Sequence, residues 1–142
     1  MDNQLRIMQF KLLHRILPVN TWLYKCGLTN TNTCSFCHIH IETIQHLMWE
    51  CNLSKNIWLA LCQHMNIPFF TMKETLLGKQ TGSAIEHIKL ITKNYIFRTK
   101  LDNNLPNFQF LKQIIKSKVK IERNCSSRQQ FIKKWGTLHT LF

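Results

Sequence analysis

The sequence has few acidic residues and little glycine, and both shortages exclude classes of active site. Its 142 residues contain only seven Asp and Glu, and Asp2 and Asp102 are the two aspartates. Two-metal phosphoryl transfer needs clustered carboxylates, so we expect no polymerase or nuclease centre. The four glycines are scattered, which excludes a glycine-rich phosphate loop. No local grouping of a nucleophile, a histidine and a carboxylate indicates a triad. We therefore expect a protein that is not an enzyme.

Long hydrophobic runs are also missing. No window approaches the roughly 18 apolar residues that a bilayer span requires. The first ten residues, MDNQLRIMQF, lack the basic and then apolar pattern of a secretory leader. We expect an intracellular protein, nuclear or cytoplasmic, that is not secreted and has no membrane partner. Thiols stay reduced in such a compartment, so the six cysteines favour metal ligation over disulfides.

Positive charge is abundant and unevenly placed. The chain carries 19 Lys and Arg against seven acidic residues, a net charge of +12. Residues 1–88 hold seven basic and five acidic side chains, whereas residues 89–142 hold twelve basic and two acidic ones. With 44% hydrophobic residues the chain is too apolar for a disordered basic tail. A globular protein with one strongly basic half is typical of a partner of polyanions, and nucleic acid is the leading candidate.

Apolar spacing predicts a mostly α fold with no convincing strand. Helices are expected at 3–17, 20–26, 44–50, 55–65, 83–101, 106–123 and 127–138. In the first of these, Leu5, Met8, Leu12 and Ile16 share one apolar face, and Pro18 ends the helix.

One cysteine and histidine pattern stands out within the polar stretch that follows residue 29. Cys34, Cys37, His46 and Cys51 form C-x2-C-x8-H-x4-C. Three thiolates and one imidazole suit tetrahedral Zn²⁺. A Cys-x2-Cys turn directs two thiolates at one ion, and its backbone N–H groups can bond to sulfur. Four protein ligands leave no open position, so we expect one structural zinc and no catalytic one.

Other residues compete with this interpretation. Cysteine is also a small buried hydrophobe, so the pattern has a plain packing alternative. His38 and His40 are rival ligands, although exposed loop histidines are the favoured interpretation for both. Glu42 and Glu50 are interpreted as solvated surface carboxylates. With the zinc pattern in the first half and the basic helices in the second, the sequence predicts three parts. These are a small zinc-knuckle-like module embedded among short helices at 1–66, a connection at 67–82 and a basic helical extension at 83–142.

The remaining cysteines and the tryptophans are expected to have packing roles. Cys62 lies on an apolar helix face and should join the core, and Cys125 should lie in a loop. Cys26, at a helix end, fits either the core or a solvent-facing position. Base stacking is an alternative for tryptophan, but core packing is favoured for Trp22, Trp49, Trp58 and Trp135.

Basic residues on the C-terminal helices are the candidate contacts to nucleic acid. Lys112, Lys116, Lys120 and Arg123 form one stripe at spacings of four, four and three. On helix 83–101, Lys89, Lys93 and Lys100 are expected on the outer face. The alternative for such stripes is a solvated helix face. The full candidate set is Lys89, Lys93, Lys112, Lys116, Lys120, Arg123, Lys133 and Lys134.

These motifs together resemble a known family. FKLLHRILPVNTWLYKCGL, then CSFCHIHIETIQHLMWEC and then Trp58 are similar to the zinc-binding C-terminal domain of non-LTR (LINE-type) retrotransposon reverse transcriptases. Residues 9–58 match that pattern closely, and the segments at 95–101, 120–122 and 131–136 look like the tails of vertebrate members. The resemblance implies zinc ligation by the four pattern residues and RNA or DNA binding by the surrounding basic surface.

The resemblance also sets the functional alternatives. The endonuclease and polymerase regions of the family are absent, so the chain looks like a separated C-terminal piece and no catalysis is carried over. The favoured function is a nucleic-acid-binding accessory module that holds phosphates during target-primed reverse transcription. The alternative is a structural or protein-docking module on the reverse transcriptase core, or a remnant without independent activity. A base-reading zinc finger is disfavoured, because no helix places base-reading side chains at finger spacing behind the ligands.

Overall fold

The computed structural model describes residues 2–78 and 83–142. Among these residues it contains α1 (Asn3–Leu13), α2 (Asn20–Lys25), the π-helical turn η1 (His46–Glu50), α3 (Asn52–Met65), α4 (Met72–Leu76), α5 (Ala84–Leu101), α6 (Phe108–Cys125), α7 (Arg128–Trp135) and the 3-10 turn η2 (Leu138–Thr140). An isolated antiparallel bridge between Thr33 and Ile41 is the nearest approach to a strand in this part of the chain. The prediction of a mostly α fold is confirmed.

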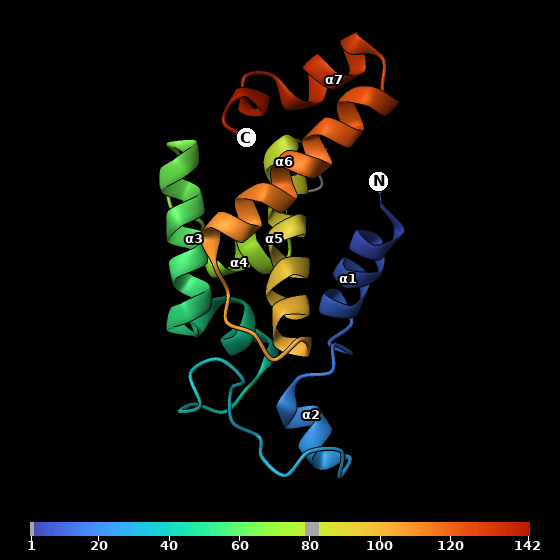
Figure 1. Cartoon of the computed structure of the whole chain (residues 1–142). Coiled ribbons are helices and arrows are strands. Elements are labelled where there is room, and N and C mark those ends of the chain that lie inside the picture. Colours follow the sequence, from blue (N-terminus) through green and yellow to red (C-terminus); the bar gives the residue numbers. More distant parts are fainter. Residues whose placement is uncertain (1, 79–82) are drawn as a thin grey trace.

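Helix α5 lies at the centre of the molecule, with α1 on one side and α3 on the other (Figure 1). Helix α6 crosses α5 and also contacts α3. The segment with α2 and the loop at 27–45 lies at one end, whereas α7 and the C-terminus lie at the other. One continuous hydrophobic core joins residues before 66 to residues after 83. The predicted module and extension therefore share their packing. Part of the predicted connection, 79–82, is outside the described residues.

The central position of α5 overturns one prediction. Lys89, Lys93 and Lys100 are 4%, 2% and 6% exposed, so they do not lie on a solvated face. Amphipathic spacing alone makes the lysine side of this helix look external. In the folded chain, neighbouring segments cover that side too, and the lysine stems pack while their amines find polar partners.

Two of these lysines connect α5 to its neighbours. Lys89 Nζ lies 2.9 Å from a carboxylate oxygen of Glu86 and 4.3 Å from the ring centroid of Phe70. Lys93 Nζ donates to Oε1 of Gln9 on α1 at 2.6 Å. Burial lowers the pKa of Lys93 to about 8. The amines are satisfied, but holding them inside carries a desolvation cost.

Helix α1 ends earlier than the sequence predicts. It stops at Leu13, where the chain reverses: the N–H of Ile16 donates to the carbonyl of Lys11 at 3.0 Å, and Arg15 has φ 55°. This is the usual left-handed helix ending. Ile16 is consequently 55% exposed, so its predicted place on the buried face is wrong. Pro18 only bounds the helix from outside.

The packing predictions for tryptophan and cysteine are partly correct. Trp58 and Trp135 are fully buried, and Cys62 is 3% exposed in the core. Trp49 is partly buried against the core. Trp22 is 53% exposed, so the expectation of a core role is wrong for this residue. It lies on α2, which has no buried residue.

Candidate metal centre

The four predicted zinc ligands come together in space. Their ligand atoms all lie within 4.8 Å of one another. The Sγ atoms of Cys34 and Cys51 are 3.9 Å apart, and Sγ of Cys37 is 3.4 Å from Nε2 of His46. Tetrahedral zinc with Zn–S of about 2.3 Å and Zn–N of about 2.0 Å separates two sulfurs by about 3.8 Å, and sulfur from nitrogen by about 3.5 Å. The donor set and its spacing therefore fit one structural zinc.

A tight loop positions the first two ligands. The N–H of Cys34 donates to the carbonyl of His40 at 2.8 Å, next to the bridge between Thr33 and Ile41. The N–H of Phe36 donates to Sγ of Cys34 at 3.4 Å. The prediction that backbone N–H groups of the Cys-x2-Cys turn bond to sulfur is confirmed.

The turn η1 positions the other two ligands. The N–H of His46 donates to Oγ1 of Thr43 at 3.0 Å, so this hydroxyl satisfies a backbone donor at the start of the turn. The N–H of Cys51 donates to the carbonyl of His46 at 2.8 Å. A hydrogen bond between residues five positions apart, in place of the four of an α-helix, defines a π-helical turn. It joins the backbones of the two ligands directly, so their side chains approach the ion from one short segment.

Side chains of α3 satisfy carbonyl groups that the π-turn leaves free. The hydroxyl of Ser54 donates to the carbonyl of Leu47 at 2.6 Å, and Nε1 of Trp58 donates to that of Met48 at 2.8 Å. All four residues are buried. Ser54 lies inside α3, which begins at Asn52 and not at the predicted residue 55. Its role is to support the wall of the metal centre.

The environment of the buried thiols favours a thiolate. The Cys34 thiol donates to the sulfur of Cys51, and this hydrogen bond lowers the pKa of Cys51 to about 7. The backbone N–H groups of Leu53 and Ser54, in the first turn of α3, lower it further. The hydrogen bond to Cys51 and then burial raise the pKa of Cys34. A bound divalent cation would ionise both sulfurs.

A buried carboxylate fastens this loop to two helices. Glu42 is 0% exposed, so the prediction of a solvated side chain is wrong. Its Oε1 accepts the N–H of Asn20 at 2.8 Å, and its Oε2 accepts the N–H of Ser35 at 2.7 Å. Lys100 Nζ lies 3.3 Å from Oε1 and also donates to Oδ1 of Asn20 at 3.0 Å. Because Ser35 lies inside the Cys-x2-Cys turn, Glu42 orients this turn without being a metal ligand itself.

The remaining candidates lie outside the centre. His38 and His40 are exposed and do not belong to the metal cluster, as the favoured interpretation predicts. Glu50 is exposed, as expected. Cys26 is exposed at the end of α2. Cys125 is exposed too, but as the last residue of α6 and not in a loop.

Comparison with known proteins agrees with this geometry. Residues 2–58 match the family model for zinc binding in reverse transcriptase. The match covers less than half of the chain, contains all four ligands and ends at Trp58. No curated protein and no solved structure matches the chain. The N-terminal part of the chain is thus a zinc-binding module similar to those of reverse transcriptases.

The candidate contacts to nucleic acid have different fates. Lys116, Lys120, Arg123 and Lys133 are exposed, whereas Lys112 and Lys134 are half-buried. Lys89 and Lys93 are buried inside the helical core, and this corrects their assignment as contacts for a bound polyanion. The candidate contacts that remain accessible therefore lie on α6 and α7. Across residues 2–78 and 83–142, none of the helices has the length and apolar character of a membrane span.

Glu122 holds α7 against α6. Its carboxylate accepts hydrogen bonds from Lys134 and from Nε1 of Trp135, both at 2.5 Å. Burial raises the pKa of Glu122, but these hydrogen bonds outweigh it and lower the pKa overall. Lys134 also lies 2.8 Å from Nδ1 of His87, whose pKa falls to about 4 through burial and the neighbouring ammonium. Lys134 is therefore engaged within the fold.

Proposed function

We propose that this chain is a zinc-stabilised accessory module of a LINE-type reverse transcriptase, which binds RNA or DNA through phosphates and performs no chemistry itself. The match at residues 2–58 and the four-ligand centre support the kinship with reverse transcriptases. The charge of the second half of the chain supports the polyanion partner. The single observation that carries the binding proposal is the stripe on α6.

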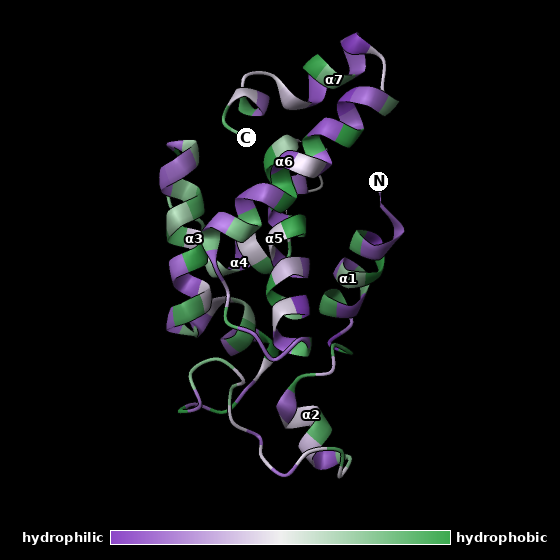
Figure 2. Ribbon diagram, viewed as in Figure 1, coloured by the Kyte–Doolittle hydropathy of each residue, from purple (hydrophilic) through white to green (hydrophobic). Residues whose placement is uncertain are grey.

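The basic stripe, defined as Lys112, Lys116, Lys120 and Arg123, has the geometry for phosphate contact. Among the described residues, no carboxylate forms an ion pair with any of its four members. From Lys112 to Arg123 the stripe covers eleven residue steps of α6, about 16 Å at 1.5 Å per residue. That length covers about five nucleotide steps of a B-form strand. Purple segments along α6 mark the polar side of the helix in Figure 2.

Packing inside the chain explains why this stripe is available. The apolar face of α6 places Leu111, Ile115 and Val119 in the core, and this fixes the rotation of the helix. Lys118, on the other flank, is held by Asp2 at 2.5 Å. The stripe is thus presented on a rigid helix, and ordering it on binding costs little more than the side-chain entropy.

The proposal is tested by titrating a 12-nucleotide single-stranded RNA against the zinc-loaded chain at several salt concentrations. Four phosphate contacts predict a slope of about −3 in log affinity against log salt, or about a fifty-fold loss between 50 and 200 mM. Replacing Lys116 or Lys120 with Gln should reduce the slope by about 0.7 each. Lys55→Gln, on the exposed side of α3, is the matched control and should change nothing. Affinity that is weak and independent of salt would refute phosphate binding.

A further inference from the structure

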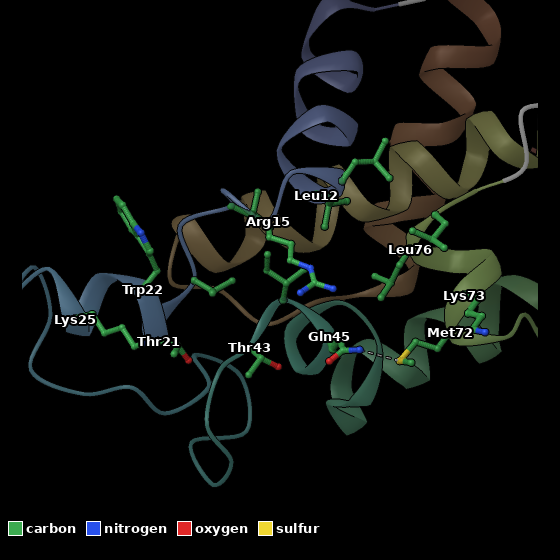
Figure 3. A pocket seen from close by; sticks show the side chains of 15 residues that line it. Leu12, Arg15, Thr21, Trp22, Lys25, Thr43, Gln45, Met72, Lys73 and Leu76 are labelled. Atoms are coloured by element: carbon green, nitrogen blue, oxygen red, sulfur yellow. Dashed lines mark hydrogen bonds between the residues drawn. The ribbon is translucent and has the colours of Figure 1, made fainter.

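A cavity of about 590 Å³ opens between the end of α1, α2, residues 43–45 and α4 (Figure 3). Most of its lining is aliphatic, with Leu12, Val19, Ile44, Met72 and Leu76 among the side chains. None of the metal ligands and none of the basic-stripe residues lines it. The zinc module and α4 together form its walls, so this groove exists only in the folded chain.

The charges around the groove are all positive. Arg15, Lys25 and Lys73 line it, and no acidic residue does. The guanidinium of Arg15 points into the middle of the groove, while Lys25 and Lys73 lie toward opposite ends (Figure 3). None of these three cations has an ion pair with a carboxylate in the described part of the chain. The groove is therefore complementary to an apolar ligand that carries negative charge.

Arg15 occupies a backbone position that suits other residues better. Within the described residues, four helices end with a left-handed residue and the same backbone hydrogen bond across it. The residues are Gly27 after α2, Asn66 after α3, Asn103 after α5 and Arg15 after α1. Glycine and asparagine adopt this conformation at lower cost than arginine, by about 1 kcal/mol for glycine. Non-glycine residues in strained conformations concentrate at binding and catalytic sites. The placement of the guanidinium in the groove accounts for an arginine at this strained position.

Helix α1 has apolar side chains that the residues described in the structure leave exposed. Its inner side buries Leu5 and Met8, yet Ile7, Phe10 and Leu13 on its outer side are 54%, 55% and 51% exposed. Leu13 also lines the groove, so the exposed apolar side of α1 adjoins the groove at this residue. Surfaces of this kind mark contacts with other proteins.

We propose that this surface docks an amphipathic helix of a partner protein, with its apolar side chains in the groove and Asp or Glu on its flanks opposite Arg15, Lys25 and Lys73. Helix-in-groove recognition uses aliphatic walls of this type. A nucleic-acid strand fits less well, because bases need aromatic platforms and Trp22 is the one aromatic side chain lining the groove as the structure describes it. The inference stands apart from phosphate binding by α6.

The test uses the full zinc-loaded chain and three probes. The first is an 18-residue synthetic peptide with Leu and Phe at helical spacings of three and four and Glu on the flanks. The second is the same peptide with Lys in place of Glu, and the third is a 12-nucleotide single-stranded RNA. Affinity is measured by isothermal titration calorimetry, and the site is located by amide chemical-shift changes.

We expect the acidic peptide to bind at least tenfold more tightly than the basic one and to shift amides around Leu13 and Ile44. Arg15→Gly should weaken the acidic peptide about tenfold while the melting temperature stays constant or rises, because glycine suits the left-handed position. Leu77→Glu, at the exposed margin of the groove, should abolish binding. Asn103→Gly is the matched control for the backbone effect and should leave binding unchanged.

Three results would overturn the proposal: equal affinity for both peptides, no binding of either, or an acidic peptide that is insensitive to both Arg15→Gly and Leu77→Glu. RNA that shifts the groove amides and loses affinity in Arg15→Gly would reassign the groove to nucleic acid. RNA affinity that depends on Lys116 and not on Arg15 belongs to the separate surface on α6. The two proposals can therefore fail independently.

Discussion

Replacing Glu42 with Gln is the sharpest test of how the fold supports the metal centre. The carboxylate is fully buried, accepts two backbone N–H groups and pairs with Lys100 at 3.3 Å. Glutamine keeps the shape and one acceptor oxygen. Its amide NH₂ group must then face either the N–H of Asn20 or that of Ser35, and donor would oppose donor. The buried ammonium of Lys100 would lose its counter-charge.

The expected loss is large for a protein of this size. Removing one partner of a buried ion pair costs about 3–5 kcal/mol, and a charged hydrogen bond left unmade lies within that range. We expect the free energy of unfolding to fall by about 4 kcal/mol, against a total of about 5–15 kcal/mol for a natural domain. At about 2–4 °C per kcal/mol, the melting temperature should drop by roughly 10 °C. Urea unfolding in saturating zinc, followed by circular dichroism at 222 nm, measures the loss.

Metal affinity supplies a second reading of the same variant. Ser35 lies within the Cys-x2-Cys turn, so loss of its acceptor should loosen the first two ligands. Partners of this kind behind a metal site contribute about 10–100-fold in affinity. Competition with a chromophoric chelator measures the change. Glu50→Gln is the matched control, because Glu50 is an exposed carboxylate in the same module.

A double-mutant cycle separates the ion pair from the hydrogen bonds. Lys100→Met alone leaves Glu42 without its counter-charge, and the double variant removes both charges from the interior. We expect the double variant to be more stable than the sum of the single losses predicts, by about 1–3 kcal/mol. Additive losses, or a loss below 1 kcal/mol in Glu42→Gln with unchanged zinc affinity, would refute this account of Glu42.

Two further predictions concern the metal and a buried amine. Elemental analysis should find one zinc per chain, and removal of zinc with a chelator or by Cys37→Ser should abolish the cooperative melting transition. Cys125→Ser, at an exposed site, is the control and should leave the transition in place. A metal-free chain with unchanged melting would contradict a structural site. Burial lowers the pKa of Lys93 to about 8 from an unfolded value of about 10.4. Between about pH 8 and about 10.4 the unfolded chain therefore binds more protons than the folded chain. The free energy of unfolding should rise with pH across that range. Lys93→Met should remove this rise and add about 1–2 kcal/mol at pH 7, once the lost bond to Gln9 is deducted; an unchanged pH profile would show that Lys93 titrates normally.

The metal ligands could be predicted from the sequence because their constraint is local. Cys34, Cys37, His46 and Cys51 lie within 18 residues, and the bond lengths of one ion fix their spacing. The buried face of α6 was equally readable, since Leu111, Ile115 and Val119 follow the helical period over a long segment. Neither inference required knowledge of contacts with residues that are distant in the sequence.

Glu42 and Lys93 show where such inference fails. Both are charged residues in segments with a polar side, and charge alone predicts solvent for them. Their partners, Lys100 for Glu42 and Gln9 for Lys93, are respectively 58 and 84 positions away in the chain. Only the assembled fold brings these groups together, so burial and pairing of the two residues could not be derived from local pattern.

The amino-acid sequence by itself determined the helical class, the zinc ligands and the excess of positive charge, because each follows from residue type and short-range spacing. The tertiary structure decided which cations remain available. Packing on all sides of α5 removes Lys89, Lys93 and Lys100 from the surface, while the core face of α6 turns Lys116, Lys120 and Arg123 outward. It also created the groove around Arg15, whose walls come from four separate segments. A surface is a property of distant parts brought into contact, and no single stretch of sequence encodes it.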